Sequence, residues 1–130
     1  MIYRIAEYAD WNRAQGEGVF ASADLALEGF IHCSEFHQVL RTAEKYYAGK
    51  TDLVLLEIDD SLLGTALVRE NLTGSGIFPH VYEPIPLAAI VRHFKAMKTH
   101  NNSGVIPANS EAAPSLQVWL SELGFPPSRE

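Results

Sequence analysis

The segment Gly29–Ser34 carries side chains whose types and spacing suit the binding of a nucleotide or another anionic ligand. Read as a strand, it places Phe30, His32 and Ser34 on one face and runs directly into the next predicted helix. A neutral imidazole can donate to or accept from a ribose hydroxyl. A hydroxyl at a helix N-terminus can cap the first free amides or leave them to a phosphate. We therefore predict a ligand site at His32 and Ser34, and a packed histidine followed by a capping serine is the alternative left open.

A second segment, Phe78–Tyr82, contributes another histidine further along the chain. In an extended segment His80 and Tyr82 share one face, and the prolines around them favour extended backbone. Prolines also reduce the entropy lost when a loop is held still, which suits the wall of a binding site. We predict that His80 and Tyr82 form the wall opposite His32. The alternative is that Tyr82 packs together with Phe78 while His80 is solvated.

Further polar residues extend this candidate site. Glu70 ends a predicted strand just before a glycine-containing loop, where a carboxylate can act in catalysis. Arg4 can hold a phosphate if the first strand lies beside Gly29–Ser34, because a guanidinium suits that group. Arg41 and Thr42 lie about two turns into the predicted helix, from which a side chain reaches back to the helix N-terminus only with difficulty.

Several well-known kinds of site are excluded by the sequence. It contains no P-loop, no G-x-G-x-x-G after a strand and no nucleophile elbow. His32 and His80 can serve as two metal ligands, yet no third histidine or carboxylate stands at a diagnostic spacing from them. A metal-dependent hydrolase is therefore the weakest hypothesis, and we expect no metal.

Composition sets the scale of the fold and narrows the partners. The chain has 130 residues, of which 47% are hydrophobic and 20% charged, as expected for one soluble globular domain. A formal net charge of −6 argues against broad binding of nucleic acid, which needs a basic face. Cys33 is the single cysteine, so no internal disulfide can form. Its place on the other face of the strand predicts a small buried side chain.

Hydrophobic periodicity predicts an α+β fold built on a strongly bent sheet. The apolar run Leu53–Ile58 is expected to be a central strand covered on both faces, with 65–70 as its hairpin partner. Ser34 is expected to cap the best-defined helix, from Glu35 to about Ala48. The other expected elements are short: strands at 2–5 and 90–94, a helix begun by Asp10 and stopped by Gly16, and a helical turn stopped by Gly29.

The chain is expected to divide into one folded domain and a C-terminal extension. Residues 1–97 form the predicted domain, and 98–115 have the Asn-, Ser-, Gly-, Pro- and Ala-rich composition of a linker. Residues 116–130 are predicted to be a short helix and tail, whose apolar face with Trp119 docks on the domain or on a protein partner. The start of the chain lacks the features of a signal peptide, and no stretch is apolar enough to span a bilayer. We therefore expect a cytoplasmic protein that does not enter membranes.

From Ile2 to about Ile90 the sequence resembles an uncharacterised bacterial family known as domain of unknown function 952. Its specific motifs are Gly-Phe-Ile-His at 29–32 and Phe-Pro-His-x-Tyr at 78–82. The resemblance is also carried by Tyr3, Arg4, Trp11, Gln38, Thr42, the run Leu53–Ile58 with Asp59, and Glu70. Glu83 departs from the family pattern, which usually has glycine there.

That family is similar in turn to proteins of the ADP-ribosyltransferase fold, nearest to RNA 2′-phosphotransferases. The matching residues are the pair His32 and Ser34, the pair Ile58 and Asp59 at a strand end, and Pro86 before the last strand. The resemblance implies a bent, split, mostly antiparallel sheet with short helices and an NAD or nucleotide cleft, in which His32 contacts the substrate. The chain departs from the phosphotransferases at Arg4, where they carry histidine, and in having few of their arginines.

Two function hypotheses follow from these residues. In the first, an enzyme or sensor binds NAD or a related nucleotide, with ADP-ribosyl transfer or cleavage of the NAD glycosidic bond as its reaction. Its catalytic residues are then His32 and Glu70, and its ligand-binding residues are Arg4, Ser34, Gln38, Thr42, His80 and Tyr82. In the second, a non-catalytic module on the same fold binds a small ligand or a protein. The missing arginines and the predicted C-terminal helix favour the second hypothesis.

Overall fold

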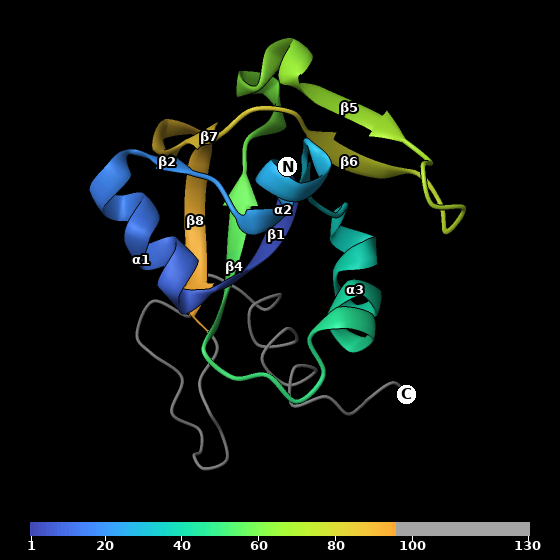
Figure 1. Cartoon of the computed structure of the whole chain (residues 1–130), viewed down its shortest axis with the longest axis horizontal. Helices are drawn as coiled ribbons and strands as arrows, with labels where there is room; N and C mark the ends of the chain where they lie inside the picture. The colour runs from blue at the N-terminus through green and yellow to red at the C-terminus, as the bar shows by residue number, and fades with distance from the viewer. Residues whose placement is uncertain (96–130) are drawn as a thin grey trace.

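A three-stranded antiparallel sheet lies at the centre of the computed structural model, which describes residues 1–95 (Figure 1). Its strands are β1 (Ile2–Glu7), β4 (Leu53–Ile58) and β8 (Ile90–Lys95), in the order β1-β4-β8. Every residue of β4 is buried, because β4 has a strand on each side and packed side chains on both faces. This explains why its sequence is almost continuously apolar.

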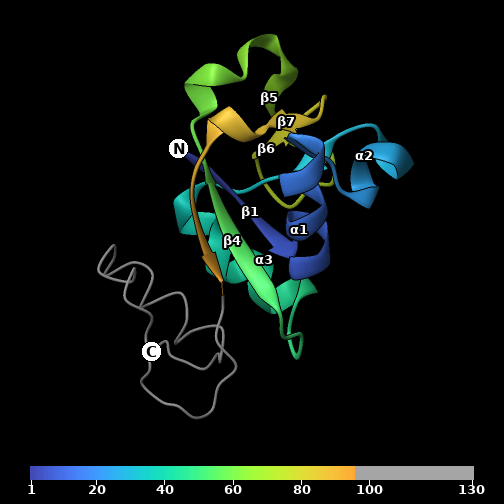
Figure 2. The same cartoon turned by 90° about the vertical axis from the view of Figure 1, so that its left-hand side faces the viewer.

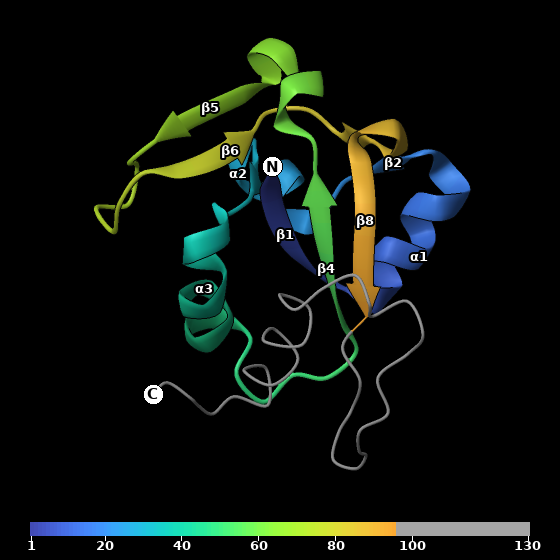
Figure 3. The same cartoon turned by 180° about the vertical axis from the view of Figure 1, so that it is seen from behind.

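One helix packs on each face of this sheet, since successive strand residues point to opposite sides. Helix α1 (Tyr8–Glu17) packs Trp11 and Ala14 into a core that contains Val54, Leu56 and Ile58 of β4. Helix α3 (Val39–Tyr46) packs on the other face, where Val39 and Ala43 join Tyr3, Ile5, Leu53, Leu55 and Phe94. Figures 2 and 3 show the two helices on opposite sides of β1 and β4.

A second three-stranded sheet projects to one side of the first, as Figure 1 shows. Its order is β3-β6-β5, and its bounds are β3 (Ile31–His32), β6 (Phe78–Val81) and β5 (Leu67–Glu70). An antiparallel bridge between Tyr3 of β1 and Ser34 joins the two sheets, with N–O distances of 2.8 and 2.7 Å. The sheet is therefore split into two parts that are linked by one pair of backbone hydrogen bonds.

Short elements connect these sheets. Strands β2 (Val19–Phe20) and β7 (Ile85–Pro86) form a two-stranded antiparallel pair. Helix α2 (Ala23–Glu28) ends at Gly29, whose φ of 94° is a left-handed conformation that favours glycine. The 3₁₀ helices are η1 (Phe36–Gln38), η2 (Asp60–Leu62), η3 (Gly64–Ala66) and η4 (Leu87–Ala89).

Several sequence predictions are confirmed. The fold is α+β, and every pair of named strands is antiparallel. Leu53–Ile58 is the central strand, the last strand begins at Ile90, and Gly29 stops a short helix. Cys33 is buried, with 4% of its surface exposed.

The predicted hairpin between Leu53–Ile58 and residues 65–70 is wrong. β5 covers only Leu67–Glu70 and pairs with β6, because both edges of β4 are already taken by β1 and β8. The 3₁₀ helices η2 and η3 carry the chain away from β4 between the two strands. The apolar pattern identified the strand but did not indicate its partner.

The predicted helix bounds are also partly wrong. The helix expected from Glu35 to about Ala48 is a 3₁₀ turn followed by α3, which ends at Tyr46. Helix α1 begins at Tyr8, so that Asp10 lies in its first turn instead of capping it. That helix passes through Gly16 and is closed by Gly18, whose φ is 84°.

Other predictions fall beyond the described residues. The linker predicted at 98–115 and the helix and tail predicted at 116–130 lie outside residues 1–95. The docking of this helix on the domain or on a protein partner therefore stays a prediction. Within residues 1–95 no helix combines the length and the apolar character needed to cross a membrane. The cytoplasmic location stays a prediction.

We expect Leu56→Ala to lower the free energy of unfolding by about 3 kcal/mol, because it opens a cavity in the central strand. Leu56 is fully buried, whereas 58% of Leu72 is exposed, so Leu72→Ala is the matched control and should change stability by less than about 0.5 kcal/mol. Urea denaturation followed by tryptophan fluorescence measures both. Equal losses in the two variants would contradict this assignment of the core.

Candidate functional site

His32 and His80 are neighbours because β3 and β6 pair with these two residues opposite each other. Their ring centroids lie 5.3 Å apart in an edge-on arrangement. Phe30 packs against both rings, stacked on His80 at 4.1 Å and tilted against His32 at 4.7 Å. The alternation along Gly29–Ser34 places Phe30 and His32 on one face, as predicted, but His80 lies beside His32 on the neighbouring strand and does not form an opposite wall.

A carboxylate orients the ring of His80. Glu70 Oε2 lies 2.8 Å from His80 Nδ1 and also accepts a hydrogen bond from the hydroxyl of Tyr82. The hydrogen bonds from Tyr82 and His80 hold the pKa of Glu70 below its usual value. An ionised carboxylate only accepts, so Nδ1 of His80 carries the proton. In the neutral ring, Nε2 then keeps its lone pair for another partner.

His32 is oriented in a similar way by a different element. Its Nε2 lies 2.9 Å from Oε1 of Glu28, at the end of α2, and 40% of its side chain is exposed. Donation from Nε2 to this carboxylate leaves Nδ1 of the neutral ring as an acceptor. His32 and His80 lie side by side, and each neutral ring thus has one nitrogen that no carboxylate holds.

An ion pair between Arg4 and Asp24 fixes the backbone of His32. Arg4 Nη1 lies 2.7 Å from Asp24 Oδ2, and 11% and 12% of the two side chains are exposed. Arg4 Nη1 also donates to the carbonyl oxygen of His32 at 3.0 Å, and the amide of His32 donates to Asp24 at 2.9 Å. Burial acts to raise the pKa of Asp24, but the charge of Arg4 and the hydrogen bonds to the carboxylate hold this pKa below its usual value.

Ser34 does not cap the following helix, contrary to the sequence prediction. Its hydroxyl lies 3.1 Å from the hydroxyl of Thr42 on α3. Glu35 is the N-cap of η1, and Gln38 Oε1 accepts from the amide of Glu35 at 2.9 Å. Because the carboxylate of Glu35 already lies at the start of this helix, the anion site predicted there is not available to a ligand.

One cleft of about 600 Å³ collects most of the predicted site residues. Arg4, His32, Ser34, Thr42 and His80 all line it. They come from β1, β3 and the bridge residue after it, α3 and β6. The volume lies within the range of about 300–1,000 Å³ that is usual for small-molecule sites.

Three predicted residues do not line this cleft. Glu70 accepts a hydrogen bond from Tyr82 and contacts His80 Nδ1, and neither Glu70 nor Tyr82 is part of the lining. Gln38 is buried, and its Nε2 donates to the carbonyl oxygen of Ile77 at 2.8 Å, so it ties η1 to the approach of β6. The structure thus gives these three side chains a supporting position around the cleft.

The cleft has further polar and aromatic lining residues that the sequence reasoning missed or set aside. They are Glu7, Asp10, Asp24, Glu28, Arg41, Lys45, Tyr46, Tyr47, Lys50, Thr73 and Ser75. The spacing of Arg41 and Lys45, one helical turn apart, is a signal that could have found the α3 side of the cleft. Thr73 and Ser75 lie in the loop between β5 and β6, which no motif connects to α3.

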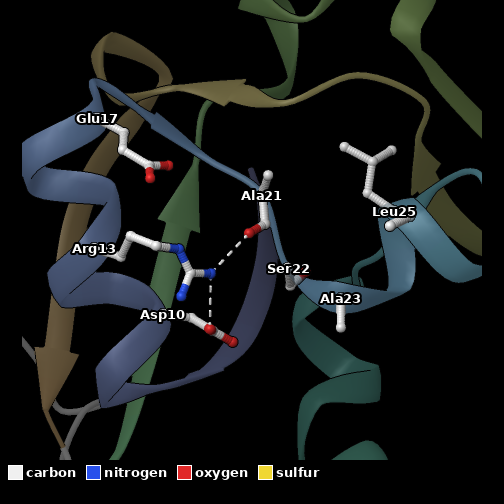
Figure 4. Close-up of a pocket in the computed structure, with 8 residues that line it drawn as sticks. Asp10, Arg13, Glu17, Ala21, Ser22, Ala23 and Leu25 are labelled. Carbon is white, nitrogen blue, oxygen red and sulfur yellow. Dashed lines mark hydrogen bonds and ion pairs between the residues drawn. The ribbon is translucent and has the colours of Figure 1, made fainter.

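A second hollow, between α1 and α2, is a weaker candidate (Figure 4). It has a volume of about 610 Å³, and its lining includes the carboxylates Asp10 and Glu17 and one basic residue, Arg13. The guanidinium of Arg13 already donates to Asp10 at 2.9 Å and to the carbonyl oxygen of Ala21 at 3.3 Å. With its cation occupied in this way, the hollow is less suited to a charged ligand than the cleft at His32 and His80.

Metal and thiol chemistry find no support in the described part of the chain. Across residues 1–95 no group of three or more histidine, cysteine, aspartate or glutamate side chains is placed to hold a metal ion. Burial raises the pKa of the Cys33 thiol to about 12, so the thiolate needed for nucleophilic attack is scarce at neutral pH.

A comparison with protein families decides the family. Residues 5–93 match the family described as "Protein of unknown function (DUF952)". The chain belongs to the DUF952 family. The match includes His32, Ser34, Thr42, Glu70 and His80, whereas the lining residues Tyr3 and Arg4 lie just before it, so most of the cleft lies within the matched part. No curated protein matches the chain.

Solved structures of another protein are similar to this DUF952 chain. The crystal structure of CC0527 from Caulobacter crescentus shares 34% identity with a TM-score of 0.68, covering 85% of this chain and 96% of that one. The crystal structure of a double mutant of CC0527 shares 33% identity over the same portions, also with a TM-score of 0.68. The solution NMR structure of CC0527 shares 32% identity with a TM-score of 0.64, covering 87% and 96%. The resemblance to the ADP-ribosyltransferase fold stays a prediction.

Asp24→Asn tests the ion pair at Arg4. A carboxylate whose pKa is lowered in the folded state adds stability above its unfolded pKa, here the ordinary value of 3.8, and loses it as the pH falls through the folded pKa. We expect the variant to be less stable than the wild type by about 3 kcal/mol at pH 7, because Arg4 loses its partner.

This difference should shrink as the pH falls below about 4, toward the lowered pKa of Asp24. Urea denaturation at a series of pH values measures it. Asp52→Asn is the control, since Asp52 is exposed and its φ of 59° also suits asparagine. A difference that stays constant down to about pH 2 would show that the ion pair does not contribute.

Proposed function

We propose that the cleft binds a nucleotide-type ligand, with NAD as the first candidate. The observation that supports this is the gathering, in about 600 Å³, of two oriented histidines, two bonded hydroxyls and several cations and aromatic rings. These side chains come from segments that are far apart in the sequence. Ligand sites typically combine an enclosed volume of this size with a few placed polar groups.

The free ring nitrogens suit the ribose of such a ligand. His32 Nδ1 and His80 Nε2 can each accept a hydrogen bond from a ribose hydroxyl, because carboxylates hold the other nitrogens. Ser34 and Thr42 share one hydrogen bond, so the hydroxyl that accepts in this pair can donate to a neighbouring oxygen of the ligand. Phe78 and Tyr46 line the same cleft and offer ring faces on which a base can stack.

The resemblance to ADP-ribosyltransferase-fold proteins supports the same ligand class, and it would make the protein an enzyme of ADP-ribosyl transfer or NAD cleavage. Cleavage of the NAD glycosidic bond passes through a cationic ribosyl centre, which a nearby carboxylate stabilises. The position of Glu70 favours the second candidate, a binding module without catalysis. Its carboxylate lies outside the lining and already accepts hydrogen bonds from His80 and Tyr82.

Binding is tested by titrating ¹⁵N-labelled full-length protein with NAD and following the backbone amides by NMR. We expect shifts at Ile31–Gln38 and Pro79–Tyr82, and an affinity about fivefold to tenfold lower in His32→Gln, which loses one hydrogen bond to the ligand. His37→Gln is the matched control, because His37 is exposed and outside the lining. No shifts at millimolar NAD would overturn the proposed ligand.

Catalysis is tested by incubating the protein with NAD and measuring the release of nicotinamide. If the protein is the enzyme, Glu70→Gln should lower the rate by about 100-fold, since the charge that orients His80 is lost. Glu44→Gln, an exposed substitution on α3 outside the lining, should leave the rate unchanged. Binding of NAD without any release by the wild type would favour the non-catalytic module.

A further inference from the structure

Among residues 1–95, most charged side chains that line the cleft have a partner of opposite charge or a histidine partner, but two cations do not. Each of its four carboxylates has a basic group within 3.1 Å: Glu7 with Lys50, Asp10 with Arg13, Asp24 with Arg4, and Glu28 with His32. These pairs account for every acidic residue in the lining. Three of the four carboxylates therefore pair with a permanent cation, whereas Glu28 bonds a histidine that carries a charge only when it is protonated.

Two lining cations are left over. Among residues 1–95, neither Arg41 nor Lys45 forms a salt bridge with a carboxylate. They lie four residues apart on α3, which places their side chains one above the other on the same side of the helix. Lys45 Nζ lies 5.2 Å from the ring centroid of Tyr46, another lining residue. The α3 side of the cleft thus carries an unneutralised positive charge.

Hydroxyl groups line the same cleft as these cations. Thr42 lies between Arg41 and Lys45 in the sequence, and its hydroxyl reaches that of Ser34. The loop between β5 and β6 brings Thr73 and Ser75 to the same cleft. In Figures 1 and 3 the β5–β6 hairpin extends sideways past the upper end of α3. Cations together with hydroxyl donors are the usual partners of phosphate oxygens.

The other places expected to hold a phosphate are already occupied. Nη1 of Arg4 donates to Asp24 and to the carbonyl oxygen of His32, so the charge of Arg4 is paired with Asp24, although its buried Nε has no hydrogen-bond partner among residues 1–95. The start of the helical segment after Ser34 carries Glu35, whose carboxylate is 2.6 Å from Arg69. Among residues 1–95 the lining cations without a carboxylate partner are therefore Arg41 and Lys45, and an anion in the cleft would bind there.

We propose that Arg41 and Lys45 form the diphosphate subsite of the cleft, and that the ligand runs from them to a ribose at His32 and His80. This rests on the proposed function and deepens it, since it selects a nucleoside diphosphate group over an uncharged nucleoside. A guanidinium and an ammonium one turn apart match a ligand with negative charges on two adjoining groups. Arg41 gives the sharper test, because a lysine in the last turn of α3 is also favoured by the helix dipole.

The test compares NAD, adenosine and inorganic pyrophosphate as NMR titrants of the full-length protein. Wild-type protein should bind NAD about tenfold or more tightly than adenosine, and Arg41→Gln and Lys45→Gln should each weaken NAD by about tenfold. Both variants should bind adenosine as the wild type does. Lys95→Gln is the matched control for the loss of one positive charge, since Lys95 lies outside the lining.

The outcomes separate the two proposals. If NAD binds in the cleft and both variants bind it as tightly as the wild type, the diphosphate subsite is wrong while the nucleotide proposal stands. If wild-type protein does not bind NAD, the nucleotide proposal is wrong, and pyrophosphate decides the subsite. Amide shifts at 41–45 that both substitutions abolish would support it, and no shifts with pyrophosphate would overturn it.

Discussion

The buried ion pair of Arg4 and Asp24 is the interaction on which the site depends. It joins three elements, because Arg4 belongs to β1, Asp24 belongs to α2, and both side chains bond the backbone of His32 in β3. Strand β3 is only two residues long, so its own pairing with β6 is small. The ion pair supplies the missing restraint by fixing both the amide and the carbonyl group of one residue. A buried pair of this kind adds little net stability but strongly restricts geometry.

The position of the histidines follows from that restraint. Once the backbone of His32 is fixed, the β3–β6 register places it opposite His80, and each imidazole receives a carboxylate from a separate element. The two rings thus present their free nitrogens to one cleft, with Phe30 packed behind them. Three of the four carboxylates of the cleft pair with permanent cations, and among residues 1–95 this leaves Arg41 and Lys45 of α3 as lining cations without a carboxylate partner. The cleft therefore has hydrogen-bond acceptors on its sheet side and cations on the side formed by α3.

The sequence predicted the parts of this arrangement that rest on local pattern. The apolar run of β4 and the alternation along Gly29–Ser34 have periods that a strand imposes, so the central strand and the shared face of Phe30 and His32 could be foreseen. The partner of β5 and the pairing of Arg4 with Asp24 could not, because they join segments distant in the sequence. Ser34 before a helix fitted a cap equally well, and only the tertiary contact with Thr42 distinguishes the two roles.

The reactivity of the buried Cys33 thiol can report on local opening of the structure around β3. Cys33 stands between His32 and Ser34, its amide donates to the carbonyl oxygen of Pro79 at 3.0 Å, and the chain has no other cysteine. Thiol reagents need an exposed thiolate, so they react here only when β3 separates from its neighbours. The rate at which a reagent labels Cys33 then measures how often β3 separates from the strands beside it. A ligand bound in the cleft, whose lining includes Cys33, would slow the reaction by holding β3 in place and by covering this residue.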